Sequence, residues 1–435
     1  MLRPILIILF FVFIAVLMIT RKIQTMLALP VLAVGIALLS GAPLIGVVDE
    51  KDVGIFTTVI NAGLTSQASA MMSLVLAAWL GQLMTHVGVS KRIVRTAAEL
   101  GGDKALLVTI CLSIATALLS MVLTGLGSTI MVGSIVLPIM LSVGVPAATA
   151  ACVFLASRGI GLSVSVSSWQ QYISLTGVAQ EDIRTMAFIL CGLTAATVLL
   201  FIIVEFKRNG MKFSCAQKAA AAETEADEFR VPALSLLTPI VPVLLVLIFN
   251  IAINVALVLA IVYLYVVSVV FNPKKVSQIT SILNRSGVEG VSNSGSALIL
   301  LMGIGILLKA VTHPMVQACL SPLFSAIVPS AFIGYVIFFI LVAPLSLYRG
   351  PMNMWGLGSG IIAIVMGTGN LPANAVVGAF LASERIQSIS DPTNSHSVWT
   401  ANFVGCEVNQ IMFKLLPYLW GLASIGVVIS AILYM

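Results

Sequence analysis

Two polar stretches interrupt otherwise apolar sequence, and each carries residues that could bind an anion. The first runs from Arg158 to Gln171, and the second runs from Glu384 to His396. We expect Arg158 and Arg385 to bind a carboxylate, because a guanidinium group can hold it through two parallel hydrogen bonds. Nearby hydroxyl and amide side chains would complete a substrate site: Ser163, Ser165, Ser167, Ser168, Gln170, Thr393 and Asn394.

Two alternatives stay open for these stretches. They could be ordinary polar loops between membrane spans, and Arg385 could form a structural ion pair with Glu384 or Asp391. Against plain loops, the apolar runs that precede them, 147–157 and 372–383, are too short to cross a bilayer alone. Interrupted spans that occur as a pair are typical of a transport site.

Asp391 is the expected site of a coupling ion, since a carboxylate can take up a proton or bind Na⁺. Ser390 lies next to it, and His396 could relay a proton. In the alternative reading, Asp391 caps a helix before Pro392 and His396 makes a structural hydrogen bond. Na⁺ at Asp391 is the metal that this pattern allows.

A second pair of breaks lies upstream, at 124–129 and 348–353. Their glycines would allow close approach of the backbone. A helix that starts after each break would point its positive end at a bound anion. Arg349 and Asn353 would then join the substrate site, and Thr124, Ser128 and Thr129 would join the ion site. Simple turns between helices are the alternative.

The composition excludes most other kinds of site. The six cysteines form no CxxC pair, and the three histidines are too widely spaced for a metal site. The chain has no GxxxxGK[ST], GxSxG or HExxH motif, so we expect neither catalytic residues nor an organic cofactor. Hydrophobic residues make up 60% of the chain and charged residues 9%, against about 25% charged in soluble domains. The chain is therefore expected to lie in a membrane.

Fourteen apolar segments could each cross the bilayer. Segments 128–143 and 351–368 are short and rich in glycine, so they could instead be re-entrant hairpins, which would leave twelve crossings. With alternating spans, sixteen of the 22 Lys and Arg residues fall on one side, which is then cytoplasmic. The segments are 2–20, 23–41, 68–86, 104–124, 128–143, 147–178, 184–204, 234–250, 253–271, 295–311, 330–348, 351–368, 372–402 and 411–433.

The chain reads as two related halves. Pro146-Ala147 and the sequence FLAS at 154–157 recur as Pro372-Ala373 and FLAS at 380–383, both 226 residues later. Seven predicted spans separate the equivalents, an odd number, so the halves would face opposite ways. We predict an all-α polytopic membrane protein of 12–14 helices in two inverted repeats with broken helices. The predicted repeats are 1–204 and 234–435, with a cytoplasmic linker at 205–233.

This layout resembles the ion-transporter superfamily, with gluconate- and citrate-type symporters nearest. The resemblance rests on the chain length, the early hairpin, the run from Gly81 through Gly88-Val89-Ser90-Lys91-Arg92-Ile93 and the two Ser- and Thr-rich breaks. It implies a multi-pass inner-membrane protein that imports a carboxylate such as citrate, gluconate or a C4-dicarboxylate with H⁺ or Na⁺. The first break departs from the gluconate pattern, since it has Ser and Gln where that pattern has His and Pro.

Other functions stay open. A Na⁺/H⁺ antiporter of the same superfamily would bind the cation directly at Asp391. A channel or a membrane-embedded enzyme would belong to another class, although no nucleophile–base or two-Asp arrangement is evident. The expected partners are a small organic anion and the lipid bilayer, with no nucleic acid, and both a monomer and a homodimer are compatible with the sequence.

Overall fold

The computed structural model describes residues 2–20, 22–48, 51–102, 104–209 and 229–435. The first half of the chain contains a small antiparallel ribbon, β1 (Val47–Val48) and β2 (Lys51–Asp52), and is otherwise helical. Its helices are α1 (Leu2–Ile19), α2 (Thr25–Ser40), η1 (Ile55–Asn61), α3 (Ala62–Ser66), α4 (Ala68–His86), α5 (Val89–Gly101), α6 (Ala105–Ser120), α7 (Gly125–Ser142), α8 (Ala147–Ser163), α9 (Val166–Thr176) and α10 (Gln180–Arg208).

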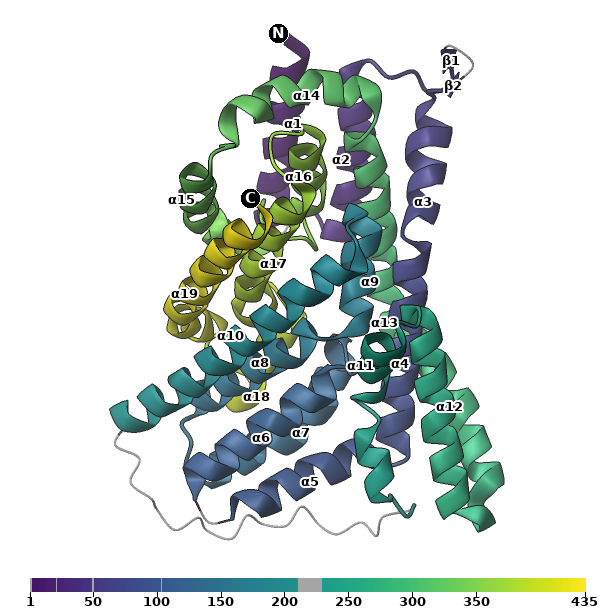
Figure 1. The fold of residues 1–435 in the computed structure, drawn as a ribbon, viewed down its shortest axis with the longest axis vertical. Helices are drawn as coiled ribbons and strands as arrows, with labels where there is room; N and C mark the ends of the chain where they lie inside the picture. Colours follow the sequence, from purple (N-terminus) through teal and green to yellow (C-terminus); the bar gives the residue numbers. More distant parts are fainter. Residues whose placement is uncertain (1, 21, 49–50, 103, 210–228) are drawn as a thin grey trace.

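The second half, in its described residues, consists of helices joined by turns and loops, without a strand. In Figure 1, α12 and α13 stand upright beside α3 and α4, next to the tilted helices α5 to α8. Its helices are η2 (Ala233–Leu237), α11 (Val241–Phe249), α12 (Ile253–Phe271), η3 (Pro273–Lys275), α13 (Val276–Val311), α14 (Pro314–Ile327), α15 (Phe332–Val342), η4 (Ala343–Arg349), α16 (Gly358–Gly367), α17 (Ala373–Ser390), α18 (Ser395–Val404) and α19 (Val408–Tyr434).

The multi-pass helical membrane fold is confirmed, and its broken helices are present. Within the described residues, seven helical segments have the length and composition to cross a bilayer, or eight if the bent pair α8–α9 forms one span. Five further apolar helices have only 10–17 residues. The sequence predicts twelve to fourteen crossings because it counts every apolar run, including runs that fold as short helices such as α6 and α16.

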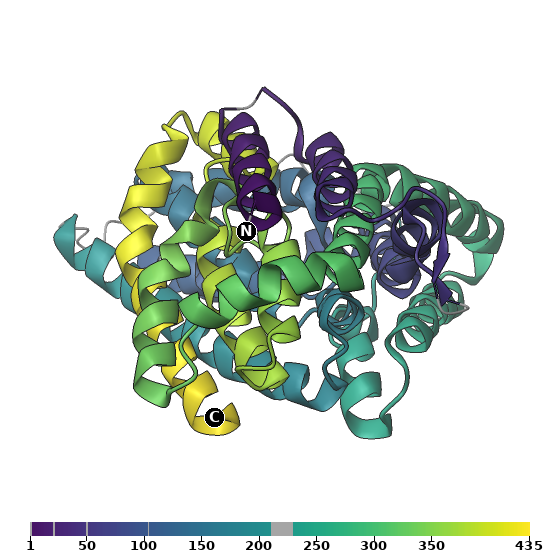
Figure 2. The same ribbon diagram turned by 90° about the horizontal axis from the view of Figure 1, so that it is seen from above.

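Apolar side chains cover the outside of the molecule as well as its core. Leu9, Ile248, Leu341 and Ile432 are each at least 60% exposed, as expected when lipid, not water, is the solvent. Seen from above, the yellow C-terminal helices and the teal-green helices α11 to α13 lie on opposite sides of the molecule (Figure 2).

The helices α8 and α17 begin at opposite ends of α10. Near the start of α8, the Thr149 hydroxyl donates a 3.1 Å hydrogen bond to Glu205 at the C-terminal end of α10. Near the start of α17, the Asn374 amide donates a 2.8 Å bond to Asp182 at the N-terminal end of α10. Asp182 and Glu205 are about 35 Å apart along a straight helix. If the two halves are inverted repeats, the equivalent helices α8 and α17 should begin at opposite sides of the membrane, and this arrangement is consistent with that.

The repeat boundaries 1–204 and 234–435 stay a prediction. Helix α10 continues to Arg208, so the first residues of the predicted linker, 205–208, are helical. Residues 210–228 of that linker lie outside the described residues.

Two glycines let α8 pack closely against its neighbours. A Cβ atom on Gly161 would lie 2.1 Å from the carbonyl oxygen of Ala117 on α6. A Cβ atom on Gly159 would lie 2.4 Å from the Ile389 side chain on α17. The absence of a side chain at these positions therefore brings α8 against both helices.

Candidate functional site

Each predicted polar stretch contains a helix break, and both breaks are shorter than expected. Only residues 164–165 separate α8 from α9, and the two helices meet at a bend of 63°. Residues 391–394 separate α17 from α18. Consequently Arg158 lies within α8, and Glu384 and Arg385 lie within α17. The Pro-Ala pairs mark the starts of both helices, because Pro146 and Pro372 are their N-cap residues.

The second break is stabilised by its own side chains. Asp391 is extended (φ −63°, ψ 119°), as a residue before proline prefers. Its Oδ1 accepts hydrogen bonds from the Thr393 backbone N–H at 2.8 Å and from the Thr393 hydroxyl at 2.7 Å. Asn394 occupies the N-cap position of α18, and its side-chain amide donates a 2.8 Å bond back to the Gln387 carbonyl of α17. Asp391 is thus the C-cap residue of α17 and precedes Pro392, as the alternative reading expected, and its role at an ion site stays a prediction.

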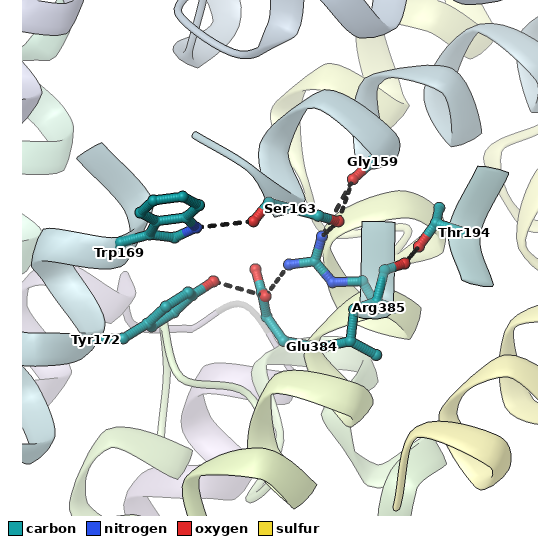
Figure 3. Close-up of polar contacts among 8 residues, drawn as sticks. Gly159, Ser163, Trp169, Tyr172, Thr194, Glu384 and Arg385 are labelled. Carbon is teal, nitrogen blue, oxygen red and sulfur yellow. Dashed lines mark hydrogen bonds and ion pairs between the residues drawn. The ribbon is translucent and has the colours of Figure 1, made fainter. Parts of the chain in front are cut away.

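The two broken helices meet at a buried ion pair between Glu384 and Arg385 (Figure 3). Nη1 of Arg385 donates to the Ser163 hydroxyl at 2.6 Å and to the Gly159 carbonyl at 3.1 Å. The Tyr172 hydroxyl donates a 2.6 Å hydrogen bond to Oε2 of Glu384. These contacts join α17 to both α8 and α9. In this state Arg385 therefore forms the structural ion pair that was one of its two expected roles.

The indole of Trp169 completes this junction. Its Nε1 donates a 2.9 Å hydrogen bond to the carbonyl oxygen of Ser163, the last residue of α8. Because Ser163 ends the helix, this carbonyl would otherwise have no intrahelical partner. The Trp169 side chain is fully buried, so it fixes the direction in which α9 leaves the break.

Four charged or titratable groups form a second cluster, which we call the charged cluster: Arg158, Arg349, Asp391 and His396. The His396 ring interacts electrostatically with both arginines, and Arg349 interacts with Asp391. The backbone N–H of Arg349 also donates to Oδ2 of Asp391 at 3.5 Å. The structure thus brings together predicted residues from the first break, the second break and the upstream break at 348–353.

The loop that carries Arg349 has an unusual backbone. Tyr348 and Arg349 both have positive φ angles, 55° and 60°, a conformation that L-residues adopt at a cost. Nη1 of Arg349 donates to the Trp355 carbonyl at 3.3 Å. Oδ1 of Asn353 accepts from the Trp355 N–H at 2.8 Å. The sequence expected a break here, and the loop places Arg349 at the charged cluster.

Buried polar atoms without a hydrogen-bond partner concentrate around these breaks. Within the described ranges, twelve buried side-chain N or O atoms have no partner, and eight of them belong to the two broken helices or to Asn353. Unpaired buried polar atoms are rare in folded proteins, and they often mark places where water, an ion or a ligand binds. The eight are Arg158 Nη1, Gln171 Oε1, Asn353 Nδ2, Arg385 Nε, Gln387 Oε1, Ser388 Oγ, His396 Nε2 and Ser397 Oγ.

The other predicted substrate residues lie at the same breaks. Ser165 is the N-cap of α9 and shares a 3.0 Å hydrogen bond with Ser167. Gln170 donates to the Ser174 hydroxyl at 3.3 Å. Ser163, Ser165, Ser167 and Asn394 are buried, whereas Ser168, Gln170 and Thr393 are half-buried.

The predicted ion-site residues are only partly brought together. The Ser390 hydroxyl, one residue before Asp391, donates to the Ile386 carbonyl of its own helix at 2.8 Å. Thr124, Ser128 and Thr129 lie at the start of α7, and the Thr129 hydroxyl donates to the Gly125 carbonyl at 2.8 Å. In the described part of the chain, no hydrogen bond links these three residues to Asp391. Nor do three or more His, Cys, Asp or Glu side chains gather there as a metal site.

A cavity beside α9 contains polar residues that the sequence analysis did not assign. It lies between α9, α13, the α3–α4 junction and the loop before α16, and Gln67, Gln171, Tyr172 and Trp355 line it. Gln67 and Gln171 are both buried, and the Oε1 atom of each has no partner among the described residues. Gln67 immediately precedes the predicted span 68–86, and Tyr172 immediately follows the first polar stretch, so position beside these segments was the only signal in the sequence for either residue.

No protein-family model matches the chain, and no curated protein matches it by sequence. Solved structures with the same fold exist. The Alcanivorax borkumensis YdaH transporter, described as having an unusual topology, superposes with a TM-score of 0.61 at 12% identity, over 99% of this chain and 97% of its own. Neisseria gonorrhoeae MtrF, described as illuminating a class of antimetabolite efflux pumps, superposes with a TM-score of 0.57 at 11% identity, over 94% of each chain. The chain therefore has the fold of these membrane transporters.

Proposed function

We propose that this protein is a secondary transporter that carries an organic carboxylate across the membrane with H⁺ or Na⁺. The proposal rests on the burial of Arg158. Its side chain is 3% exposed, and its Nη1 has no hydrogen-bond partner among the described residues. A buried cation is costly unless an anion or polar groups compensate it. A substrate carboxylate is the natural partner at a midplane break between paired broken helices.

The proposed substrate site is centred on Arg158 and Arg349 of the charged cluster. Asn353 contributes its unpartnered Nδ2 atom, which can donate to a carboxylate or hydroxyl oxygen. The hydroxyls and amides of the breaks would bind the rest of the substrate. They are Ser163, Ser165, Ser167, Ser168, Gln170, Thr393 and Asn394, and Arg385 joins them when its ion pair with Glu384 opens.

The proposed coupling site is Asp391, with His396, Ser390, Thr124, Ser128 and Thr129 as further candidates. Asp391 is fully buried, yet its Oδ2 makes only a long contact, 3.5 Å, with the Arg349 N–H. That oxygen could take up a proton, or bind Na⁺ together with neighbouring oxygen atoms. The same observation favours a second candidate, a Na⁺/H⁺ antiporter that binds its cation at Asp391.

We propose import across the cell inner membrane, with citrate, gluconate or a C4-dicarboxylate as substrate. The import direction and these substrates rest on the resemblance to gluconate- and citrate-type symporters. The likeness to MtrF, which is described as an efflux pump, favours export as the second candidate direction. Helices with the same fold could support either direction, because the imposed gradients decide the net flux.

Uptake into proteoliposomes tests the proposal. The purified protein is reconstituted, and labelled citrate, gluconate and succinate are offered under inward H⁺ or Na⁺ gradients and without a gradient. We expect one of these anions to accumulate only when a cation gradient is present. The absence of uptake for all three under every gradient would contradict the carboxylate symporter. Proton movement driven by a Na⁺ gradient alone would favour the antiporter.

A further inference from the structure

Glu384 is the only acidic residue within the helices α8, α9, α17 and α18. Its side chain is 5% exposed, and it forms an ion pair with Arg385, its neighbour on α17. Burying a charged carboxylate costs free energy even when an arginine is beside it. Ionisable residues buried within a membrane protein are usually functional.

We propose that Glu384 binds a proton that enters through the cavity beside α9, and that this protonation releases Arg385 to bind the substrate anion. The inference rests on the proposed function, because it supplies the coupling between proton and anion. It assigns a role to Glu384 that differs from the role of Asp391, which lies in the break.

The route to Glu384 runs through Tyr172. This tyrosine is one of the residues that line the cavity, and its hydroxyl donates a 2.6 Å hydrogen bond to Oε2 of Glu384. The cavity also presents the unpartnered Oε1 atoms of Gln67 and Gln171. These acceptors can hold water in an otherwise apolar cavity. In the proposed route, a water molecule held in this cavity beside Tyr172 passes a proton to the tyrosine hydroxyl.

In the proposed transfer, Tyr172 accepts one proton and donates another. A hydronium ion in the cavity gives a proton to the Tyr172 oxygen, and the tyrosine passes its own hydroxyl proton to Oε2 of Glu384. The products are a water molecule, an unchanged tyrosine and a neutral carboxylic acid. The two contacts of the Glu384 carboxylate, with Tyr172 and Arg385, both involve Oε2.

The consequence for Arg385 follows from charge. Three groups that can carry charge face this position: Tyr172 on α9, Arg385 on α17 and Cys191 on α10. From α8, the guanidinium group is contacted only by uncharged oxygens, those of Gly159 and Ser163. Once Glu384 is neutral, the buried guanidinium has no anionic partner, and a substrate carboxylate can take that place. One proton would thus enter with one negative charge.

Infrared difference spectroscopy between neutral and acidic pH tests the proton site without any substrate. We expect wild-type protein to gain the C=O stretch of protonated buried carboxyl groups on acidification, and Glu384→Gln to lose the component that belongs to Glu384. The matched control is Glu205→Gln, which removes another buried, ion-paired carboxylate that lies outside the route, and it should keep the band. In Tyr172→Phe the band should shift in frequency, because the 2.6 Å hydrogen bond is gone. This variant tests the assignment even if Glu384→Gln does not fold.

Two results would overturn the inference: no carboxyl band in the wild type, or the same band in wild type and Glu384→Gln. Uptake of the citrate, gluconate and succinate panel separates this failure from that of the proposed function. If Glu384→Gln transports with unchanged dependence on the proton gradient, the proton site is wrong and the transporter stands. If the wild type transports none of these anions, the carboxylate transporter is wrong whatever the infrared band shows.

Discussion

Arg385 donates a 2.6 Å hydrogen bond to the hydroxyl of Ser163, a residue 222 positions earlier in the chain. Ser163 ends α8 at the first break, and Arg385 lies six residues before the second break. This contact is one of those that connect the two broken helices, together with the bonds from Arg385 to Gly159 and from Tyr172 to Glu384. Because both groups are buried, this contact should contribute to stability as well as to the alignment of the breaks.

Replacing Ser163 should destabilise the protein. The change Ser163→Ala leaves one N–H group of a buried guanidinium without its acceptor, which costs about 1–3 kcal/mol. The measurement is thermal unfolding in detergent, compared with Ser142→Ala, whose hydroxyl is exposed and bonds only to its own helix. Equal melting temperatures for the two variants would show that the Arg385 contact does not stabilise the junction.

Close packing of α8 against α6 predicts a strong effect at Gly161. The change Gly161→Ala would place a Cβ atom 2.1 Å from a backbone oxygen, so the helices must separate, at a cost of about 1–3 kcal/mol. Gly192 on α10 is the matched control, because a Cβ atom there meets nothing within 4 Å. Gly192→Ala should be neutral or stabilise by up to about 1 kcal/mol. Similar unfolding midpoints for both variants would contradict this packing.

The ion pair between Glu205 and Lys414 should hold α10, α19 and the start of α8 together. Glu205 is 2% exposed, and Lys414 Nζ also donates to the Thr149 hydroxyl at 2.9 Å. Lys414→Met removes the nearer cation of a buried carboxylate and leaves it only the 3.9 Å contact with the exposed Arg208, so it should destabilise by up to about 3–5 kcal/mol. The double variant Glu205→Leu with Lys414→Met should recover most of this loss. Chemical denaturation measures both, and an additive loss in the double variant would exclude the ion pair as the cause.

Two variants of Asp391 can distinguish its structural role in the turn from its proposed role as the ion site. The change Asp391→Asn keeps a side-chain oxygen for the two hydrogen bonds from Thr393, since Asn favours the same turns. We expect this variant to fold with wild-type stability and to lose its response to the cation gradient. Asp391→Ala should lose that response and about 1 kcal/mol of stability. Cation-dependent uptake that persists in Asp391→Asn would leave Asp391 as a turn residue only.

The sequence predicts the polar breaks well because they depend on local composition. Apolar runs of eleven and twelve residues cannot cross a bilayer, so the polar residues after them had to lie within it. The breaks are shorter than predicted because polar side chains can remain in a helix. The Ser163 and Ser390 hydroxyls bond to carbonyls of their own helices, and Arg385 finds its partners on α8. Arg158, Glu384 and Arg385 are therefore helical residues, not loop residues.

Contacts between residues that are far apart in the chain could not be predicted from the sequence. The bond from Tyr172 to Glu384 joins residues 212 positions apart, and nothing in the local pattern of either residue indicates it. The length of α13 was missed for a related reason. Helix α13 continues for 36 residues and includes the polar segment 276–294. Hydropathy does not indicate this, because the segment is stabilised by packing against α4, a contact that is not visible in the sequence.

The central claim is that the buried Arg158 binds the carboxylate of the transported anion, and uptake by Arg158→Ala tests it most directly. Loss of a buried charge partner costs about 2–5 kcal/mol of binding, so the apparent affinity should fall by well over tenfold. The fold should survive, since Nη1 of Arg158 has no partner among the described residues. Arg95→Ala, which removes an exposed arginine from α5, should transport like the wild type. Full uptake by Arg158→Ala at wild-type affinity would contradict the account.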